Sequence, residues 1–459
     1  MHPLFDLLVR EITTDIGQMV EEGHDAAALL AELAAVRATG SLDALAGLQE
    51  ELWRRPSPPE FPCHEPSDWE SIAAGLPDAD SHARFPGGDD DLADRLLAAW
   101  RGRCAGCQLG KIPEGLWPEE VEELLRLVGS WPLEDYLNAL GDEDYRRLSA
   151  GSEVLAKRYA TWRNTLTKGH FDRVAPDDDI HYAVIGQMIL EQYGPDFTAD
   201  QAIGKLIELS PASSVFASGR NMFRTYLFGL RPPHTAVFGN PCRQSLGAQI
   251  RCDPWGWAAP ANPALAARMA YTGAASSQVR NGIYSGIFFA VLIADVLAHG
   301  EVARAIDTAT AYVPPRSRFA EMVRLVRDRC TEADDWQQVN AAIYERYDPA
   351  YGRPGERAPM NHSLPNAAIV LMSLLMGRGD FGRTICIAVM AGRDTDCNAA
   401  TAGSILGCAV GTARIPARWT DPFGDTIATD LKGLAELKIS DLARRLHRVA
   451  RAGARFESR

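Results

Sequence analysis

The sequence predicts an all-α protein, and two observations carry that prediction. Apolar residues recur every three to four positions along most of the chain, the spacing that places them on one face of a helix. Runs in which Val, Ile and Thr alternate with polar residues, the usual mark of strands, are nearly absent. One segment is ambiguous, because Ile385–Met390 (ICIAVM) is short and apolar enough to be a buried strand. We find no internal repeat in the sequence.

The first predicted helices lie near the N-terminus. One is marked by apolar residues at helical spacing: Leu4, Leu7, Leu8, Ile12 and Ile16. Ser41 is a candidate N-cap for another, which runs to Trp53. A proline-rich connector from Arg55 to Cys63 then interrupts the pattern, and Pro86-Gly87-Gly88 closes the region. We therefore expect a domain boundary near residue 88, between a helical extension with its linker (1–88) and a larger domain (89–459).

Beyond that boundary the helical pattern continues. Pro118 is well placed to begin a helix, because proline fits the first helical position and apolar residues follow it at helical spacing. Four further helices are expected at 181–193, 282–298, 366–376 and 398–410. The last is crowded with Ala and Gly (NAATAGSILGCAV), which favours close packing against another helix around a site.

Composition places the chain among ordinary globular proteins. Of its 459 residues, 46% are hydrophobic and 23% are charged, which excludes a largely disordered or collagen-like chain. Sixty acidic residues against 47 Lys and Arg give a net charge of −13. Because an acidic surface repels phosphate backbones, we expect no nucleic-acid partner and no binding to an anionic membrane. A small phosphorylated ligand is compatible with this charge, since it needs only local donors or a bound cation.

No targeting segment is visible in the sequence. The N-terminal stretch carries acids within its apolar pattern and lacks a basic start followed by an apolar core. The longest apolar run, Ile287–Ala294, is shorter than the roughly 18–20 residues of a membrane span. Nine cysteines, an odd number scattered over a long chain, do not resemble a disulfide framework. We therefore expect a soluble, cytoplasmic protein.

Two runs of three acids each precede an apolar helical segment: Asp89–Asp91 and Asp177–Asp179. Acids at such positions usually cap the helix or interact with its dipole, a contribution of up to about 1 kcal/mol. The same carboxylates can instead bind a metal ion, and nothing within the two runs makes one of them a better candidate for a metal site than the other.

A third acidic segment is more informative. In Gly392–Asn398 (GRDTDCN), Asp394 and Asp396 are separated by one residue, at a turn between an apolar run and the Ala- and Gly-rich helix. Two carboxylates crowded into one cavity repel each other unless a cation neutralises them or they share a proton. Carboxylate oxygens select Mg²⁺, Mn²⁺ or Ca²⁺ over zinc.

Three interpretations of this segment compete. An EF-hand loop would require Gly at its sixth position and Glu at its twelfth, where the chain has Ala399 and Ile405. An aspartyl-phosphatase loop comes closer, but Cys397 takes the place of its Thr or Val, and too little chain follows for a fold that begins with this motif. The third interpretation is a carboxylate metal site completed by acids elsewhere in the chain, and Asp177–Asp179 would supply them.

A cysteine pair and a glutamate lie close together upstream. Cys104 and Cys107 form a C-x-x-C pair, but no second Cys/His pair lies at zinc-site spacing, so we expect buried structural thiols. Glu114 follows Pro113 at the end of a glycine-punctuated turn. Such a rigid turn presents the carboxylate either to a pocket, as an acid or base, or to solvent.

Three residues with aromatic rings are the last candidates for site residues. His362 directly precedes a predicted helix and is either a substrate contact or a hydrogen-bonded structural residue. Trp255 and Trp257 are able to stack on a base or sugar, although burial in the core is the usual role of tryptophan.

Taken in order, four segments resemble the ADP-ribosylglycohydrolase family across roughly residues 92–415. Residues 101–114 (RGRCAGCQLGKIPE) resemble the opening helix and loop that end in the family's catalytic Glu, and residues 177–180 resemble its T-D-D-T metal motif. Residues 247–251 (GAQIR) resemble its G-x-x-M-R ligand-contacting segment, and residues 392–400 its G-x-D-T-D-x-N-A-A motif, the most specific of the four. The resemblance implies an all-helical orthogonal bundle as the catalytic domain and a site for two Mg²⁺ or Mn²⁺ ions.

The same resemblance implies a role for each matching residue. The implied metal ligands are Asp178, Asp179, Asp394 and Asp396, with Asp177 and Cys397 completing the shell. The implied catalytic residues are Glu114, Asp178 and Asp394. The implied substrate-binding residues are Gly247, Gln249, Arg251, His362 and Asn398.

Several positions depart from the family pattern. Asp177 and Ile180 stand where the family has threonines, and Cys397 stands where it has Thr or Ser. Ser245-Leu246-Gly247 replaces Gly-Asn-Gly, and Gln278 replaces a common His. These changes bear on metal identity and on recognition of the ADP diphosphate more than on chemistry at the ribose.

We therefore expect a metal-dependent hydrolase that cleaves a bond at the anomeric carbon of a ribose through an oxocarbenium-like transition state. The expected substrate is an ADP-ribosyl conjugate, either a small molecule or an ADP-ribosylated protein. The alternatives are a hydrolase of smaller, nucleoside-like N-ribosides and an inactive ADP-ribose-binding module, with a metal-dependent phosphatase as a weaker third. The sequence leaves the oligomeric state open.

Overall fold

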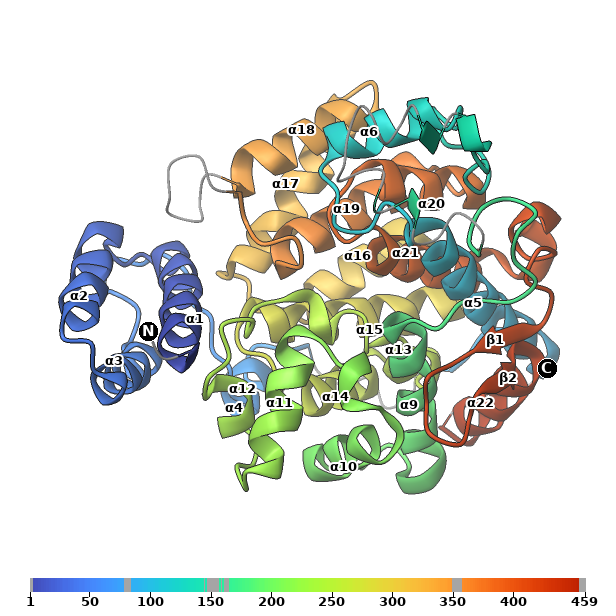
Figure 1. The fold of residues 1–459 in the computed structure, drawn as a ribbon. Coiled ribbons are helices and arrows are strands. Elements are labelled where there is room, and N and C mark those ends of the chain that lie inside the picture. The colour runs from blue at the N-terminus through green and yellow to red at the C-terminus, as the bar shows by residue number, and fades with distance from the viewer. Residues whose placement is uncertain are drawn as a thin grey trace.

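The computed structural model describes residues 3–77, 84–143, 145–146, 157, 159–160, 165–348 and 357–453. Over these residues the protein is built almost entirely of helices (Figure 1), which confirms the predicted all-α class. The two strands in this part of the chain, β1 (Thr426–Ala428) and β2 (Glu436–Lys438), form one short antiparallel pair.

The helices have the following bounds. The first half of the chain contains α1 (Pro3–Glu21), α2 (Ala26–Ala38), α3 (Leu42–Arg54), α4 (Trp69–Ala73), α5 (Asp89–Gly110), α6 (Pro118–Leu127), α9 (Asp178–Tyr193), α10 (Ala199–Leu209) and α11 (Ala217–Leu227). The second half contains α12 (His234–Val237), α13 (Asp253–Trp257), α14 (Pro263–Ala274), α15 (Asn281–His299), α16 (Val302–Thr310), α17 (Arg318–Glu332), α18 (Trp336–Tyr347), α19 (Ser363–Met376), α20 (Phe381–Met390), α21 (Thr395–Val410) and α22 (Ile439–Gly453). Short 3₁₀ turns lie at η1 (Ala212–Ser214), η2 (Leu246–Ala248), η4 (Thr412–Arg414) and η5 (Ala417–Trp419).

Helices α1, α2 and α3 form a small bundle beside the main body of the molecule (Figure 1). The bundle has its own hydrophobic core, made of Phe5, Ile12, Ile16, Met19, Leu29, Leu33, Leu45, Leu48 and Leu52. Ser41 accepts a hydrogen bond from the Ala44 N–H at 3.2 Å, which confirms the predicted N-cap of α3. Ile72 of α4 already belongs to the main core. A domain boundary near residue 88 stays a prediction.

The helices expected beyond residue 88 are present as α6, α9, α15, α19 and α21. The ambiguous segment Ile385–Met390 is helical, because it forms most of α20. Asp380 caps this helix by accepting a hydrogen bond from the Arg383 N–H at 2.7 Å. The apolar residues of α20 are buried on all sides, against α19 and α21 among others, so a helix satisfies their backbone groups without a partner strand.

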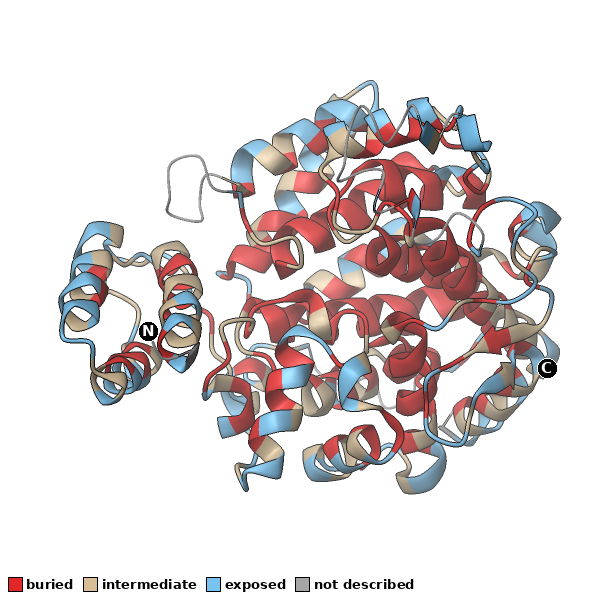
Figure 2. Ribbon diagram, viewed as in Figure 1, coloured by how far each residue is buried: buried red, intermediate tan, exposed pale blue. Residues whose placement is uncertain are grey.

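Helix α15 lies inside the main core (Figure 2). It is long and apolar enough to cross a membrane, and 94% of its apolar window is buried within the protein. Helices α13, α14, α16 and α21 pack against it. Its apolar composition therefore matches its position as the central helix of the core.

Helices α5 and α21 run antiparallel in direct backbone contact. The contact surface of α5 carries a glycine every four positions: Gly102, Gly106 and Gly110. A Cβ atom on Gly106 would lie 2.0 Å from the Ala399 carbonyl oxygen, and one on Gly110 would lie 2.4 Å from the Asp396 nitrogen. Only glycine permits this approach, which brings the end of α5 to the beginning of α21. The close packing expected of the Ala- and Gly-rich helix is confirmed.

Replacing Gly106 with alanine tests this contact. Because the added methyl group would overlap the Ala399 carbonyl, we expect Gly106→Ala to lower the free energy of unfolding by about 1–3 kcal/mol, measured by urea denaturation. Gly204 in α10 is a matched control, since a Cβ atom there meets nothing within 4 Å. Gly204→Ala should raise the free energy of unfolding by about 0.5–1 kcal/mol. An unchanged denaturation midpoint for Gly106→Ala would contradict the backbone contact.

Candidate active site

Three segments bring polar side chains to one place in the main body. They are the end of α5 with the turn after it (110–114), the beginning of α9 (177–179) and the beginning of α21 (394–397). Helix α9 begins after Asp177, whose side chain accepts a hydrogen bond from the Asp179 N–H at 2.9 Å. Helix α21 begins after Asp394, and its contact with α5 sets the distance between the first and third segments.

The turn after α5 is paired with the turn before α21. The Gly115 N–H donates to the Arg393 carbonyl and the Arg393 N–H donates to the Leu116 carbonyl, each at 2.8 Å. This two-bond bridge holds Glu114 next to the carboxylates of α21, although more than 270 positions separate them in the sequence.

The bridge depends on an unusual backbone. Gly392 and Arg393 have φ angles of 80° and 66°, a region that is unfavourable for a residue with a side chain. The Arg393 guanidinium is fully buried, and it donates to the carbonyls of residues 358 and 359 at 3.2 and 3.1 Å. It also lies 4.8 Å from the ring centre of Tyr344 and 5.3 Å from that of Trp117. These contacts stabilise the strained turn.

The acids of the three segments form one continuous acid cluster. Three groups of ligand atoms each lie within 4.8 Å of one another: Glu114, Asp394 and Asp396; Asp177, Asp178 and Asp179; and Asp179, Asp396 and Cys397. Because Asp179 and Asp396 each belong to two groups, the structure joins all the carboxylates that the sequence predicted for the site.

Lys111 lies in the middle of the acid cluster. Its Nζ atom forms ion pairs with Asp177, with Asp396 at 3.3 Å and with Glu114 at 3.5 Å. Burial opposes the charge on Lys111, but the three carboxylates outweigh that effect and raise the pKa of the ammonium group. The chain therefore carries a cation of its own within the cluster.

A second cation, Arg103, contacts the acid cluster from within the core. The Arg103 side chain is wholly buried and contacts Asp179 and Asp253, with an Nη2–Oδ1 distance of 2.9 Å to Asp179. It also donates to the backbone carbonyls of Asp179 and Ile250. Arg103 thus ties α5 to α9 and to the segment that precedes α13.

Burial raises the pKa values of four carboxyl groups in the cluster: Asp178, Asp179, Asp394 and Asp396. The pKa rises to about 6 for Asp394, where repulsion by Glu114 adds to the effect, and to about 8 for Asp179, where Arg103 opposes it. Burial likewise raises the pKa of the Cys397 thiol well above its usual value. Such a site favours binding of a further cation, which offsets the repulsion between carboxylates.

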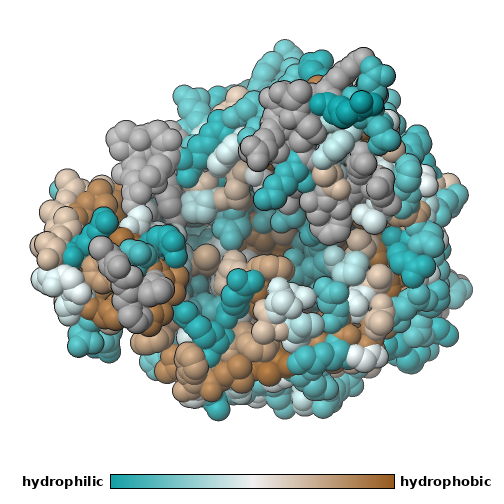
Figure 3. Space-filling model, in the orientation of Figure 1, coloured by the Kyte–Doolittle hydropathy of each residue, from teal (hydrophilic) through white to brown (hydrophobic). Residues whose placement is uncertain are grey.

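A cavity of about 490 Å³ opens onto the acid cluster. Its lining includes predicted metal and catalytic residues: Glu114, Asp178, Asp394, Asp396 and Cys397. Two predicted substrate-binding residues, Gly247 and Arg251, line the same cavity. Phe216 also lines it and is half exposed. Leu227 and Phe228, at the other end of α11, are exposed as well, and the face of the molecule in Figure 3 carries apolar patches among its polar residues.

The wall around Gly247 is held by side-chain hydrogen bonds. The Gln278 amide donates to the hydroxyls of Ser218 and of Ser245, the latter at 3.2 Å. Both serines line the cavity. The Arg251 guanidinium donates to the Ser277 hydroxyl, and burial lowers the pKa of Arg251.

Three predicted substrate-binding residues are buried outside the cavity lining defined by the described residues: Gln249, His362 and Asn398. The His362 Nε2 atom lies 3.0 Å from Glu21 Oε2, and its Nδ1 atom accepts a hydrogen bond from the Leu364 N–H. The Asn398 amide donates to Asn366 at 2.9 Å. Their contact with a substrate stays a prediction.

The remaining candidates have structural positions. Cys104 and Cys107 are buried free thiols, as expected, and burial raises the pKa of both. Trp255 and Trp257 are buried, and Trp255 stacks on Phe197 with ring centres 4.7 Å apart. Asp89–Asp91 form the first turn of α5, in agreement with the helix-dipole interpretation of that run.

Sequence reasoning missed Lys111, Arg103 and Arg393. Lys111 lies in the same glycine-punctuated turn as Glu114, and a basic residue so close to a candidate acid was the available signal. Arg103 and Arg393 offered a weaker signal, because their roles depend on burial and on contacts with segments far away in the sequence.

Comparison with known proteins agrees with the motifs. The model of the ADP-ribosylglycohydrolase family matches residues 88–453, about four-fifths of the chain. Forty-two chains of solved structures match, among them an "ADP-ribosylglycohydrolase-related protein complex" with 18% sequence identity and a TM-score of 0.45, which covers 79% of this chain and 99% of that chain. A search of curated proteins found no match. Because the family model spans well over half of the sequence, the chain belongs to the ADP-ribosylglycohydrolase family.

Proposed function

We propose that this protein is a metal-dependent glycoside hydrolase that cleaves the bond at the anomeric carbon of a ribose in an ADP-ribosyl conjugate. Membership of the family supports glycoside hydrolysis as the class of reaction. The observation that carries the proposal is the cavity of about 490 Å³, in which Glu114 and the carboxylates of α9 and α21 face the same space as Arg251. The hydroxyl groups of a ribose would bind at the acid cluster, and the negative charge of a diphosphate would pair with Arg251.

The acid cluster fits a divalent metal site. Its donors are carboxylate oxygens crowded within a few ångströms, which suits Mg²⁺ or Mn²⁺. The residues that would hold two such ions are Asp178, Asp179, Asp394 and Asp396. Bound there, the metal would supply Lewis acidity that orients ribose hydroxyls and lowers the pKa of a water molecule. Asp177 is engaged by Lys111 and by the Asp179 N–H, so it contributes less to such a site than the sequence suggested.

Glu114 is the residue best placed to move a proton. Its carboxylate lines the cavity and is about one-third exposed, whereas Asp396 beside it is buried and Asp394 is half-buried. Exposure to the cavity lets Glu114 take a proton from water or give one to the leaving group, while Asp394 and Asp396 stay in place. Their negative charge stabilises the positive charge that develops at the anomeric carbon.

A smaller N-riboside is the second candidate substrate. The hydroxyls of Ser218 and Ser245 and the amide of Gln278 bond mainly to one another. These three side chains carry no charge that could pair with a diphosphate. A nucleoside-like substrate would need only the acid cluster and a neutral pocket, so this observation favours it.

Calorimetric titration with ADP-ribose is the first test. In the presence of Mg²⁺ we expect micromolar affinity, about −8 kcal/mol, because ribose hydroxyls and diphosphate are both engaged. The Asp394→Ala/Asp396→Ala variant is the control and should lose this binding. A folded, Mg²⁺-loaded protein that does not bind ADP-ribose but hydrolyses nucleosides would favour the N-riboside. Binding without turnover of any conjugate would identify a binding module.

Glu114→Gln tests the proton-transfer role. We expect kcat for an ADP-ribosylated arginine or serine peptide to fall by at least 100-fold, since the amide of glutamine cannot act as a general acid or base. Mg²⁺ affinity, measured by calorimetry, should change little. Glu122→Gln on α6, where Glu122 pairs with Arg126 at the surface, is the control and should leave kcat unchanged. Turnover of Glu114→Gln at the original rate would exclude this role.

Lys111→Met tests whether the ammonium group competes with a metal ion. Lys111 neutralises Asp177 and Asp396, and its loss should free both for an incoming cation. We expect Mg²⁺ to bind about tenfold more tightly, roughly 1.4 kcal/mol, by calorimetry at constant ionic strength. Lys205→Met in α10 removes another buried lysine, paired with Glu208, and should leave Mg²⁺ affinity unchanged. Weaker Mg²⁺ binding by Lys111→Met would show instead that the lysine orders the acids.

A further inference from the structure

We infer that the N-terminal helices position the recognition wall of the cavity, so that α1 carries positioning residues for the ligand. The recognition wall is defined as two loops, residues 241–247 and 358–362. The identity of the ligand rests on the function proposed above, but the support that α1 gives to the two loops does not. The matched family model begins at residue 88, so this role belongs to a part of the chain outside it.

The two loops of the recognition wall are joined to each other. The Leu246 N–H donates to the Asn361 carbonyl at 2.9 Å, and the Ser363 N–H donates to the Gln244 carbonyl at 3.1 Å. Residues 245–247 from one loop and residues 360–361 from the other line the cavity. A displacement of either loop would therefore change the shape of the space beside the acid cluster.

Helix α1 and the residue directly after it contact the first loop with three polar side chains. Glu22 Oε1 accepts a hydrogen bond from the Gln244 amide at 2.7 Å. Asp15 forms an ion pair with Arg243, and the Gln18 amide donates to the carbonyl of residue 241. Asp15 and Gln18 are three positions apart on one face of α1, and Glu22 follows directly after the end of the helix.

The same helix contacts the second loop through Glu21. Its Oε2 atom lies 3.0 Å from His362 Nε2 and 3.1 Å from Arg318 Nη1. His362 directly follows the cavity-lining residue Asn361, so one side chain separates α1 from the cavity at this point. The imidazole ring of His362, a candidate site residue from the sequence, is thus held by α1.

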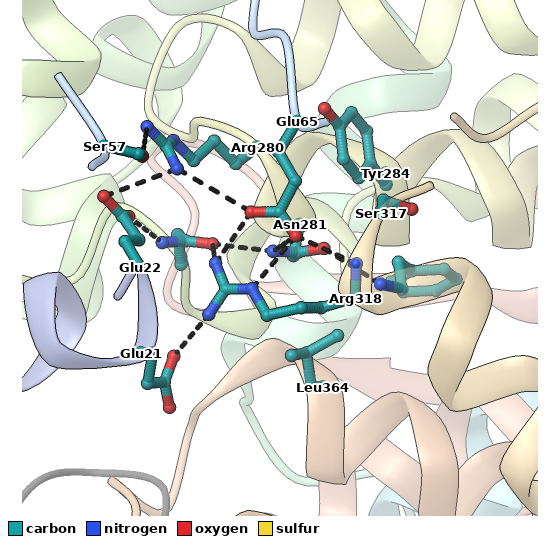
Figure 4. Close-up of polar contacts among 12 residues, drawn as sticks. Glu21, Glu22, Ser57, Glu65, Arg280, Asn281, Tyr284, Ser317, Arg318 and Leu364 are labelled. Atoms are coloured by element: carbon teal, nitrogen blue, oxygen red, sulfur yellow. Dashed lines mark hydrogen bonds and ion pairs between the residues drawn. The ribbon is translucent and has the colours of Figure 1, made fainter. Parts of the chain in front are cut away.

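The linker closes this network around Arg318 (Figure 4). Glu65 accepts hydrogen bonds from the Arg318 side chain at 2.8 and 2.9 Å and from the Asn281 amide at 3.0 Å. The Asn281 amide also donates to Gln244 at 3.0 Å. Arg280 lies 3.4 Å from Glu22 and 3.8 Å from Glu65. Helix α1, the linker and the first loop therefore meet in one buried polar network.

The chemistry of this interface suits positioning. The apolar core of α1–α3 is separate from the main core, so the contacts described here are directional hydrogen bonds and ion pairs. A buried charge is costly unless it is paired with an opposite charge. The ion pairs therefore favour one position of α1 relative to the two loops. The acid cluster is held by α5, α9 and α21. Loosening α1 should therefore disturb ligand recognition and leave the metal site intact.

The test removes both glutamates in the full-length protein. In Glu21→Ala/Glu22→Ala we expect faster backbone hydrogen exchange, measured by mass spectrometry, in peptides that cover residues 241–247 and 358–362. Peptides that cover residues 110–116 and 394–400 should exchange as in the wild type. Glu21→Gln/Glu22→Gln keeps the hydrogen-bond acceptors and should restore most of the protection. Asp6→Ala, at an exposed position of the same helix, is the matched control.

A second measurement addresses the ligand. Calorimetry should show ADP-ribose binding at least tenfold weaker in the alanine variant, with Mg²⁺ affinity within twofold of the wild type. Unchanged exchange in the two loops, an increase spread evenly over the chain, or ADP-ribose affinity equal to the wild type would each overturn the inference. If the wild type itself does not bind ADP-ribose, the proposed function fails, and the exchange data alone decide whether α1 supports the recognition wall.

Discussion

The site depends above all on the backbone contact between α5 and α21. Because glycines face the partner helix at every fourth position, the two axes approach until backbone atoms meet. The approach places the turn that carries Lys111 and Glu114 over the turn that carries Asp394 and Asp396. Larger residues at the contact would separate the two turns, and the paired bridge at Arg393 could not form. Packing deep in the core thus determines the position of groups on the cavity.

The acid cluster is built against electrostatic repulsion. Carboxylates from three segments lie within contact distance, and burial makes their charges costly. Arg103 and Lys111 offset part of that cost. Arg103 fixes Asp179 from within the core, and Lys111, in the middle of the cluster, bridges Asp177 and Asp396. Rigid helices keep the groups together, and part of the repulsion between the carboxylates remains.

Much of the fold and part of the site could be predicted from the sequence. Ser41 as an N-cap and GRDTDCN as a turn before a helix are local signals, and the structure has both. Ile385–Met390 was ambiguous because six apolar residues carry no period, and burial on all sides removed the face that would have marked a helix. The pairing of Lys111 with Asp396 and that of His362 with Glu21 could not be predicted, because 285 and 341 positions separate the partners in the sequence.

The distance along the chain between α5 and α21 also governs when the site exists. During synthesis α5 and α9 leave the ribosome long before residues 394–410, which supply the other carboxylates and the surface that covers the glycines of α5. Until then the carboxylates of residues 177–179 lack their neighbours from α21. A nascent or truncated chain that ends before α21 therefore lacks part of the acid cluster, and the site is complete only after residues 394–410 have been synthesised.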